Sequence, residues 1–375
     1  MQRGLRKLVC LYTPVVIIIS VMSLRQLRYT GLSRGETWKN ETLTDVMINK
    51  INLPQNIVNM SSVDTEVAKH AIADIFQEQS KGDLKILPDC EGTIRKAGKG
   101  IFLPLRQLSN DKLNRVLQNV HPGGHWTPNG CNPKHHVAII IPYRDRVDHL
   151  RQFLSYMHPF LQHQRVSYRI FVIEQQSPRI FNKAALMNAG FNETTRIFPK
   201  MFDCYIFHDV DMLPENDRTV YGCRNDSSAI HFAQHVSKYN YKRPAWRLTG
   251  GAVSLTPKMF RKVNGYSNAF WGWGGEDTDF ILRLEANNIT VNTCKMEDCS
   301  YFMQRHKRDK DNPTNVHQLK MISDFSLEVS QLDGIRNVSY FLETVESKQL
   351  YTWILISLNS TINARVQFNA IKKKT

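Results

Sequence analysis

The segment Phe270–Phe280, "FWGWGGEDTDF", combines bulky aromatic side chains, backbone freedom and negative charge within eleven residues. Its glycines let the chain turn tightly and approach a ligand closely. Its tryptophans offer flat apolar faces of the kind on which sugar rings stack. The glycines are Gly272, Gly274 and Gly275, and the tryptophans are Trp271 and Trp273. This combination is typical of a loop that binds a ligand.

Three carboxylates close the same segment, at Glu276, Asp277 and Asp279. They supply acceptors for ligand hydroxyls, and one of them could act as a general base that removes a proton from such a hydroxyl. A plainer interpretation is a buried aromatic corner followed by a solvated acidic loop. The segment alone therefore does not predict a binding site, and the prediction depends on other parts of the chain.

A second pair of acids, Asp209 and Asp211, flanks Val210 directly after an apolar run. Paired carboxylates at the end of a strand suit a hard divalent cation, which in turn can hold a diphosphate. The alternative is that these side chains cap the turn that follows the strand, a common role of aspartate.

The segment "YFMQRHKRDKDN", residues 301–312, adds further candidates for metal binding. Met303 and His306 are followed closely by Arg308 and Asp309. An imidazole beside a carboxylate suits manganese, whereas a thioether is an unusual ligand that favours a softer ion than magnesium. Alone, His306 would be a surface histidine and Met303 a core side chain, so the prediction rests on their combination with the aspartates.

Alternating strands and helices are predicted to position these residues. The runs "HVAIIIPYRDR", "YRIFVIEQ" and "CYIFHDVD" are typical of buried strands. Apolar residues at helical spacing follow the first run, and "NKAALMNAGF" predicts a short helix. This order predicts an α/β fold with a mostly parallel sheet. Ligands bind beyond the carboxyl ends of such strands, so residues 143–146 and 209–211 should meet at one crevice.

The N-terminus carries a separate signal. Arg3, Arg6 and Lys7 precede a 17-residue apolar run, Leu8–Leu24. The run is at the short end for a membrane span, but it is longer than a usual signal-peptide core and no clear cleavage site follows it. We therefore expect a single-pass signal anchor over residues 8–24, with a cytosolic tail at residues 1–7 and the rest in a lumen. A cleaved signal peptide and a buried helix are the alternatives.

Beyond the apolar run, residues 25–84 are polar with little periodicity and predict a stem below a globular domain, residues 85–358, and a basic tail, residues 359–375. A luminal position is supported by seven N-x-S/T sequons and by six cysteines outside the anchor, whose pairing the sequence leaves open. The sequons are at Asn40, Asn59, Asn192, Asn225, Asn288, Asn337 and Asn359, and the cysteines are Cys90, Cys131, Cys204, Cys223, Cys294 and Cys299.

The amino-acid composition and net charge exclude some classes of protein function. The chain has 375 residues, 42% of them hydrophobic, which is enough for a large core and excludes disorder throughout. Its formal net charge is +15, but the basic residues are spread along the chain and no recognition motif is present, so we expect no nucleic-acid partner. An anionic small substrate fits the charge better.

Several motifs in order resemble the β-1,4-galactosyltransferases, anchored Golgi enzymes with a GT-A type glycosyltransferase fold. They extend from about Cys90 to Ile354 and comprise "AIIIPYRDR", "FNKA", "FHDVDMLPENDRTVYGC", "GGAVSLT", "FWGWGGED", "MQRHKRD", "LDGIRNVSYFLE" and "LYT". The resemblance implies a Rossmann-like, mixed but mostly parallel sheet. It also implies a type II Golgi membrane protein whose luminal catalytic domain transfers a hexose from a UDP-sugar to a glycan.

The resemblance further implies roles for individual residues. The donor would contact Pro142, Tyr143, Arg144, Arg146, Phe181, Asn182, Lys183, Asp209, Val210, Leu248, Gly251 and Trp273. The acceptor would contact Gly275, Glu276, Asp277, Thr278, Leu319 and Ile322. Mn²⁺ would be bound by Asp211, Met303 and His306. Asp277 would be the catalytic base for the acceptor's 4-hydroxyl, and Trp273 would close over the donor on a mobile loop. Disulfides would join Cys90 to Cys131 and Cys204 to Cys223, and Cys294 and Cys299 would be a further pair or free thiols.

Four positions depart from the family's pattern. Leu248 stands where galactose-transferring members have tyrosine, which leaves room for an N-acetyl group and favours UDP-GalNAc over UDP-galactose. Thr278 replaces an acceptor-side aspartate and Ala245 an acceptor-side tyrosine. Lys183 replaces an arginine and loses its bidentate fork.

The sequence therefore predicts an inverting, metal-dependent transfer of GalNAc, or alternatively galactose, in β1,4 linkage onto a GlcNAc-terminated glycan of glycoproteins or glycolipids. Leu319 and Ile322 keep the apolar character of the pocket for the acceptor's N-acetyl group. A catalytically silent sugar-binding homologue is the competing hypothesis. The presence of a candidate base and candidate metal ligands argues against it.

Overall fold

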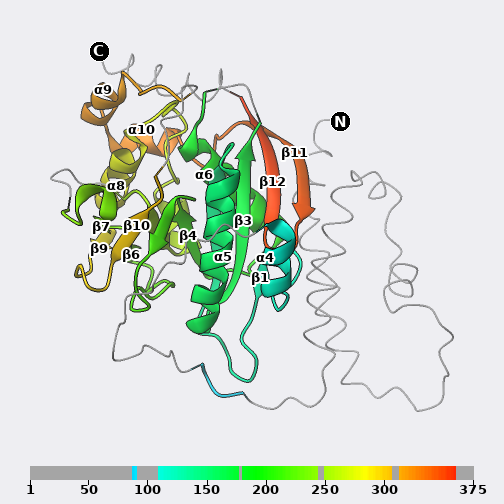
Figure 1. The fold of residues 1–375 in the computed structure, drawn as a ribbon. Coiled ribbons are helices and arrows are strands. Elements are labelled where there is room, and N and C mark those ends of the chain that lie inside the picture. Colours follow the sequence, from blue (N-terminus) through cyan, green and yellow to red (C-terminus); the bar gives the residue numbers. More distant parts are fainter. Residues whose placement is uncertain (1–86, 91–108, 177–179, 244–248, 306–311, 360–375) are drawn as a thin grey trace, which may run out of the picture. The chain divides into compact units, whose positions relative to one another are not determined.

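The computed structural model describes residues 87–90, 109–176, 180–243, 249–305 and 312–359 (Figure 1). The predicted cytosolic tail, anchor and stem lie outside these residues, as do Leu248, His306, Ala245 and nearly all of the basic tail. Among the helices of the described residues, none is both long and apolar enough to cross a membrane.

Among the described elements, strands and helices alternate over residues 136–208, as the apolar runs predict, whereas later elements include consecutive strands and consecutive helices. In chain order they are α4 (Asn110–Val116), β1 (His125–Trp126), β2 (His136–Tyr143), α5 (Val147–His163), β3 (Ser167–Gln175), α6 (Lys183–Ile197), β4 (Cys204–His208), β5 (Met212–Pro214), β6 (Ser228–His231), β7 (His235–Val236), the 3₁₀ turn η2 (Ser237–Tyr239), β8 (Ala252–Leu255), α7 (Pro257–Lys262), α8 (Glu276–Ala286), β9 (Thr290–Asn292), β10 (Ser300–Met303), α9 (Gln318–Ser323), α10 (Leu327–Leu332), β11 (Tyr340–Ser347) and β12 (Thr352–Leu358).

A mixed sheet is the centre of the described residues. It has nine strands in the order β11-β12-β3-β2-β4-β8-β6-β9, with β1 paired to β3 outside this path. The strands β12, β3, β2 and β4 are parallel. At one side β11 is antiparallel to β12, and at the other β8 is antiparallel to both β4 and β6. The predicted parallel strands therefore form the middle of the sheet, and antiparallel strands extend it on both sides.

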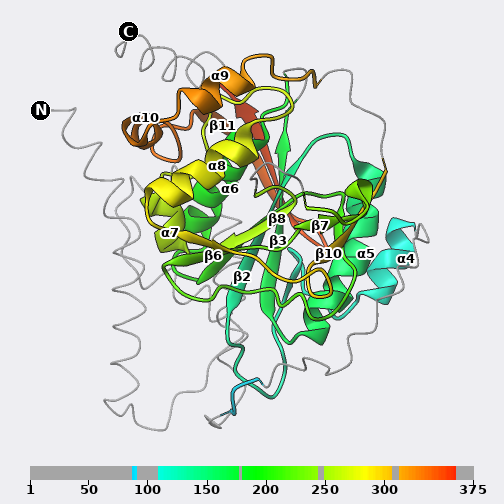
Figure 2. The ribbon, with the colours of Figure 1, turned by 90° about the vertical axis from the view of Figure 1, so that its left-hand side faces the viewer.

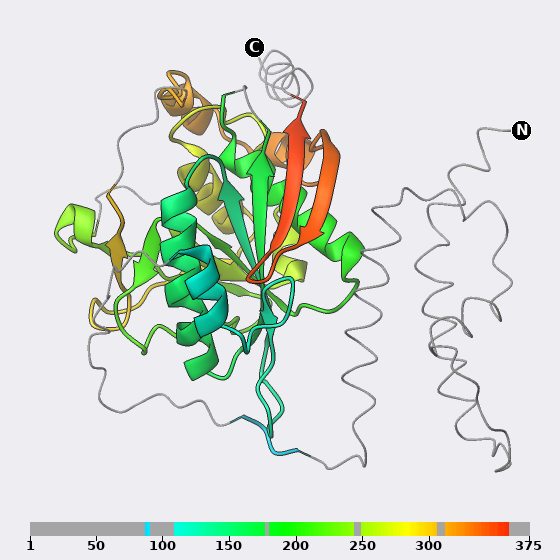
Figure 3. The ribbon, with the colours of Figure 1, turned by 45° about the vertical axis from the view of Figure 1, so that its right-hand side comes forward.

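Helices cover both faces of the central strands. Val137, Ile139 and Ile141 of β2 belong to the same buried cluster as the apolar residues of α5. On the other face, Gly190 of α6 lies directly against Ile140 and Ile173. Figures 2 and 3 show α4 and α5 on one side of the sheet and α6, α7 and α8 on the other. Since neither face meets water, these strands are continuous apolar runs rather than alternating ones.

A second, three-stranded sheet has the order β5-β10-β7. Its strands β5 and β10 are antiparallel, and Met303 pairs with Met212. Because β5 follows β4 after only three residues, this small sheet begins at the carboxyl end of a central strand. That connection places residue 303 beside residues 209–211.

Three disulfides join described cysteines. Two are the pairs that the resemblance implies, Cys90 with Cys131 and Cys204 with Cys223. The third joins Cys294 to Cys299, the pair that the sequence leaves open. An oxidising compartment suits such a set of bonds.

Candidate active site

The turn after β4 is held by a buried histidine. His208 Nδ1 lies 2.9 Å from the carbonyl oxygen of Asp209, and its Nε2 lies 2.8 Å from the hydroxyl of Tyr221. Burial lowers the pKa of His208 to about 4, so the ring is neutral near neutral pH. With its proton on Nδ1, the ring donates to the turn and accepts from the tyrosine. The path of the chain into the acidic residues is thus fixed from within the core.

A single lysine joins three carboxylates beyond this turn. Lys183 Nζ lies 3.0 Å and 2.9 Å from the two carboxylate oxygens of Asp277. It also lies 2.9 Å from Glu276 Oε1 and 3.6 Å from Asp209 Oδ1. Lys183 begins α6, Glu276 and Asp277 begin α8, and Asp209 follows β4. The ammonium group therefore links three separate elements at the carboxyl end of the sheet.

The electrostatics of this cluster leave surplus negative charge. Burial raises the pKa of Asp277 and Glu276, while the neighbouring Lys183 acts in the opposite direction. Burial likewise raises the pKa of Asp209 to about 6. Burial alone would lower the pKa of Lys183, but the three carboxylates outweigh it and keep the pKa well above the usual range. The cluster holds one ammonium group and three carboxyl groups, so binding of a further cation would be favourable.

The N-terminus of α8 presents two of these acids. Gly275, at its start, has a φ of 97°, and a Cβ there would lie 2.5 Å from Phe270 Cε1. The Thr249 hydroxyl donates to the carbonyl of Asp277 at 3.1 Å. Glu276 Oε2 is buried and has no hydrogen-bond partner. A ligand hydroxyl or amide would satisfy that oxygen, whose burial otherwise costs free energy.

The loop before α8 is anchored at two points. The Gly272 N–H donates to the carbonyl of Phe181 at 2.9 Å. Trp273 exchanges backbone hydrogen bonds with residues 313–315 through its N–H at 2.8 Å and its carbonyl at 3.0 Å. The Trp273 side chain is nevertheless 57% exposed. In contrast, Trp271 Nε1 is buried and makes no hydrogen bond.

Two of the predicted metal ligands come together through the small sheet. Met303 pairs with Met212, the residue after Asp211, and the Gln304 N–H donates to the Asp211 carbonyl at 2.8 Å. His306 lies outside the described residues, and within those residues no group of three or more His, Cys, Asp or Glu side chains is arranged for a metal. A carboxylate and a thioether beside an acidic cluster fit a transition-metal ion, with His306 as the remaining predicted donor.

The other predicted donor contacts lie in different environments. The Arg144 guanidinium is 5.2 Å from the centre of the Phe181 ring. Tyr143 is buried in the core below, and burial raises its pKa to about 12. Asn182 is fully buried. Its side-chain oxygen accepts from the Ala185 N–H at 2.9 Å and caps α6. The Gly251 carbonyl accepts from the Asp209 N–H at 2.7 Å.

Two of the predicted acceptor contacts lie on α9. Leu319 is 78% exposed and Ile322 is half-buried. Thr278, in the first turn of α8, is also half-buried.

Asp279 requires a correction. The sequence places it with Glu276 and Asp277 as an acceptor for ligand hydroxyls, but its side chain is only 2% exposed and accepts from Arg283 Nε at 2.6 Å. The i, i+4 spacing of Asp279 and Arg283 was the available signal, since residues at that spacing face each other on a helix.

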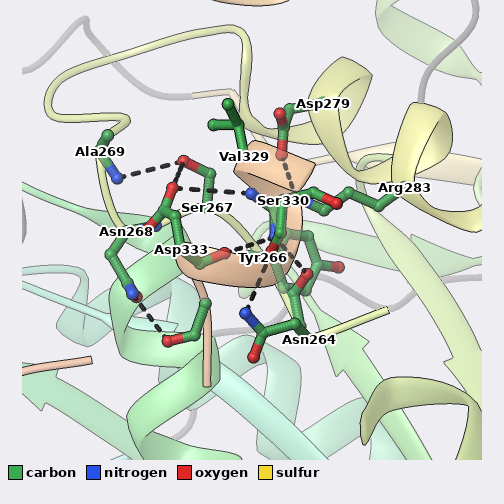
Figure 4. Close-up of polar contacts among 12 residues, drawn as sticks. Asn264, Tyr266, Ser267, Asn268, Ala269, Asp279, Arg283, Val329, Ser330 and Asp333 are labelled. Atoms are coloured by element: carbon green, nitrogen blue, oxygen red, sulfur yellow. Dashed lines mark hydrogen bonds and ion pairs between the residues drawn. The ribbon is translucent and has the colours of Figure 1, made fainter. Parts of the chain in front are cut away.

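Arg283 and Asp333 connect α8 to the chain after α10 (Figure 4). Arg283 Nη2 lies 3.6 Å from Asp333 Oδ2, and Nη1 donates to the carbonyls of Ser330 at 3.1 Å and Asp333 at 2.6 Å. The Asp333 carboxylate also accepts from the Ser267 hydroxyl at 2.5 Å and the Asn268 N–H at 3.0 Å. This buried network supports, from behind, the helix that carries Glu276 and Asp277.

Comparison with known proteins identifies the family of the site. Residues 95–224 match the family model described as the N-terminal region of glycosyl transferase group 7, and residues 230–307 match that described as the N-terminal domain of galactosyltransferase. The chain is 36% identical to β-1,4-galactosyltransferase 4 of Cricetulus griseus, over 74% of this chain and 78% of that protein. The chain belongs to the β-1,4-galactosyltransferase family. This membership confirms the resemblance on which the residue roles are based.

Further relatives agree with the assignment. Human β-1,4-galactosyltransferase 3 is 38% identical over 64% of this chain and 60% of that protein. Among solved structures, a variant of Drosophila β1,4-galactosyltransferase 7 in complex with manganese, UDP-Gal and xylobiose matches with a TM-score of 0.52 and 29% identity. The match covers 60% of this chain and 94% of that one. The described residues thus have the mixed α/β fold of GT-A type galactosyltransferases.

Proposed function

We propose that this family member transfers GalNAc from UDP-GalNAc, in β1,4 linkage and with inversion, to the 4-hydroxyl of a terminal GlcNAc on glycoproteins or glycolipids. The observation that carries the proposal is the cluster of Lys183, Asp209, Glu276 and Asp277 at the carboxyl end of the sheet. Ligands bind at this end of an open α/β sheet. The cluster offers both a candidate base and the negative charge that attracts a metal ion.

Asp277 is the proposed base. Its carboxylate is 22% exposed, so it can reach a hydroxyl, while Lys183 holds it in one orientation. Proton transfer to a positioned carboxylate makes the acceptor oxygen nucleophilic as it attacks the anomeric carbon. Glu276 Oε2, buried without a partner, would accept a hydrogen bond from the acceptor sugar. The half-buried Thr278 can also hydrogen-bond that sugar but adds no charge.

The donor side is proposed to use the residues around the two strand ends. Arg144 and Arg146 would neutralise the growing charge of departing UDP. Asp211, Met303 and His306 would hold Mn²⁺, which when bound supplies Lewis-acid stabilisation of the diphosphate. The solved relative with manganese and UDP-Gal supports this choice of ion and donor class.

The choice of sugar is proposed from one side chain. Leu248 is shorter than the tyrosine of galactose-transferring members and leaves room for the donor's N-acetyl group. UDP-galactose is the second candidate, because the relatives carry that activity in their names. The acidic cluster has the same geometry under both proposals.

The test compares the two donors. Residues 30–375 are assayed with Mn²⁺, a free GlcNAc acceptor and either UDP-GalNAc or UDP-galactose. We expect a preference for UDP-GalNAc that Leu248→Tyr reverses. Equal use of both donors, or no change with the substitution, would reject the assignment of Leu248.

A luminal, membrane-anchored position in the Golgi is proposed with this activity. The basic residues Arg3, Arg6 and Lys7, the apolar run Leu8–Leu24 and the polar stem support it. The three disulfides are consistent with an oxidising lumen.

A further inference from the structure

Two glycosylation sequons lie next to each other at one edge of the main sheet. Asn225 precedes β6 and Asn288 precedes β9, and both side chains are exposed. Their hydroxyl partners in the sequons, Ser227 and Thr290, are exposed as well. The Ser227 carbonyl accepts from the Thr290 N–H at 3.0 Å, so the two sequons are in direct contact.

The sheet topology puts these sequons far from the crevice. β6 and β4 are both antiparallel to β8 and therefore run in the same direction. β9 is parallel to β6. Asn225 and Asn288 stand before the first residues of β6 and β9, at the amino ends of strands, whereas the acidic cluster stands beyond the carboxyl end of β4. Large groups attached here would leave the crevice open.

The local geometry at both asparagines accommodates an attached group. Asn225 Oδ1 accepts from the backbone N–H and the hydroxyl of Ser227, both at 3.0 Å, which leaves its amide nitrogen outside the turn. Asn288 has a φ of 55°, a conformation that asparagine tolerates, at the end of α8. Within the described contacts, neither amide nitrogen donates a hydrogen bond.

Two other described sequons are built into the fold. Asn192 lies inside α6 and donates to the Ile335 carbonyl at 3.0 Å, and its sequon partner Thr194 is fully buried. Asn337 is half-buried, and its Oδ1 accepts from the Gly334 N–H at 2.7 Å and from Asn268 Nδ2 at 3.1 Å. A glycan on Asn192 would break this hydrogen bond, and one on Asn337 would have to leave from a half-buried side chain whose oxygen is held by two donors.

We propose that Asn225 and Asn288 carry N-linked glycans that together cover the edge strand β9, while Asn192 and Asn337 remain unmodified. The proposal rests on the luminal position proposed above. In the reaction, Nδ2 bonds to C1 of the first sugar as the bond from C1 to the diphosphate of a lipid-linked oligosaccharide breaks. The lipid diphosphate leaves and Nδ2 loses one proton.

The glycans would protect an exposed edge. Among the strands of the described residues, β9 is the last on its side of the sheet, so part of its backbone has no strand partner there. Exposed edges pair readily with other chains, and proteins block them with bulky or charged groups. Two glycans at the start of this edge would act as such a block.

The first experiment maps the occupied sites. The full chain is produced in animal cells, and its N-glycans are released enzymatically in heavy-oxygen water, which converts each glycosylated asparagine to a labelled aspartate. We expect label at Asn225 and Asn288 and none at Asn192 or Asn337. Label at Asn192, or its absence from both Asn225 and Asn288, would overturn the proposal.

The sequons in the predicted stem, Asn40 and Asn59, distinguish a failure of this proposal from a failure of the proposed luminal position. Label at Asn40 or Asn59 without label at Asn225 and Asn288 would overturn the edge proposal alone. A complete absence of label would contradict the luminal position and the edge proposal together.

Variants test the effect on the edge. Asn225→Asp keeps the acceptor for Ser227 and Asn288→Asp tolerates the positive φ, so both should fold. Each should remove one glycan and one step in gel mobility, and Ser227→Ala or Thr290→Ala should remove the same step. The double aspartate variant should self-associate more than the parent in light scattering. Unchanged self-association would reject the protective role.

Discussion

At the scale of single residues, Lys183 is the centre of the candidate site. It is the cation that three acids share, and it contacts both oxygens of the proposed base. The family resemblance implies arginine at this position, and an arginine fork pairs with one carboxylate through two parallel bonds. A lysine ammonium is a compact point charge with three rotatable donors, which suits contacts in three directions. In the proposed function, its role is to hold Asp277 charged and oriented.

Asp277→Asn should reduce transfer by about 10²–10⁴-fold, the usual contribution of a positioned base. Asparagine has nearly the same shape and still accepts from Lys183, so UDP-sugar binding should be kept. Steady-state transfer rates and donor titration would measure the two effects. A variant that transfers sugar at the parent rate would exclude Asp277 as the base.

The pH profile should report the environment of Asp277. A base works only when deprotonated, so activity is present above its pKa and is lost as the pH falls through it. Since burial raises the pKa of Asp277, the loss should begin at a higher pH than for an ordinary aspartate. Lys183→Gln removes the cation that lowers this pKa, and the acidic limb of kcat/KM should move to higher pH. Lys183→Arg, which keeps the charge, serves as the control, and a limb that stays in place in Lys183→Gln would refute the coupling.

Sequence reasoning found the residues of this cluster but not their pairing. Glu276, Asp277 and Asp209 were all candidates, and Lys183 was a candidate for the donor. Their ion pairs join residues up to 94 positions apart, which spacing along the chain does not reveal. Asp279 was misassigned because the three acids of residues 276–279 were treated as alike. The helical turn of α8 directs the last of them, Asp279, toward the core.

At the scale of elements, the start of α8 depends on Gly275. A side chain there would meet both an unfavourable backbone conformation and the Phe270 ring. Gly275→Ala should destabilise the domain by about 1–3 kcal/mol from the backbone alone, and further from the clash. It should also lower transfer, because Glu276 and Asp277 would shift. Chemical denaturation and kcat/KM would measure these changes.

Gly130 is a matched control for Gly275. Its φ is +81°, but a Cβ there would meet nothing within 4 Å. Gly130→Ala should therefore share only the backbone cost and keep transfer activity. Equal losses of activity in the two variants would show that the contact with Phe270 is unimportant.

The buried network behind α8 should dominate its stability. Arg283→Met leaves Asp279 and Asp333 buried without their cation, which should cost about 3–5 kcal/mol in the free energy of unfolding. The i, i+4 pair of Lys320 and Asp324, at 3.3 Å, provides the comparison, because the Lys320 side chain is 72% exposed and the Asp324 side chain 30% exposed. Lys320→Met should cost only about 0.3–0.5 kcal/mol. Similar denaturation midpoints for the two variants would contradict the importance of burial.

The elements divide clearly into those that the sequence predicts and those that it does not. The strands β2, β3 and β4 and the helix α5 were predictable because long apolar runs and helical periodicity mark them. The small sheet was not, because β5 and β10 are only three and four residues long and are far apart in the chain. Its pairing is decided by tertiary contacts, and it is this pairing that brings Met303 to Asp211.

At the scale of the whole described domain, the sheet is completed by its C-terminal strand. β12 lies between β11 and β3, and Trp353 Nε1 donates to the Glu174 carboxylate at 2.7 Å. A chain that ends at Ser347 would lack β12, so residues 171–175 of β3 would lose their strand partner on one side. We expect it to be insoluble or unfolded by circular dichroism.

The corresponding control ends at Asn359, the last described residue. It removes the basic tail and keeps the sheet, so its thermal unfolding should match that of the full chain. Loss of structure in this longer variant would show that the predicted domain boundary at residue 358 is wrong.

The position of β12 also affects how the protein is made. Trp353 and Glu174 are 179 residues apart, so β3 emerges from the ribosome long before the strand that pairs with it. At ordinary rates of translation, of about 5–20 residues per second, this interval lasts about 10–35 s. During that time the edge of β3 that β12 covers is open, although nearly every residue of this strand is buried in the folded domain. We therefore expect the nascent chain to depend on molecular chaperones until synthesis is nearly finished, and the domain to fold as a unit only after its end has been released.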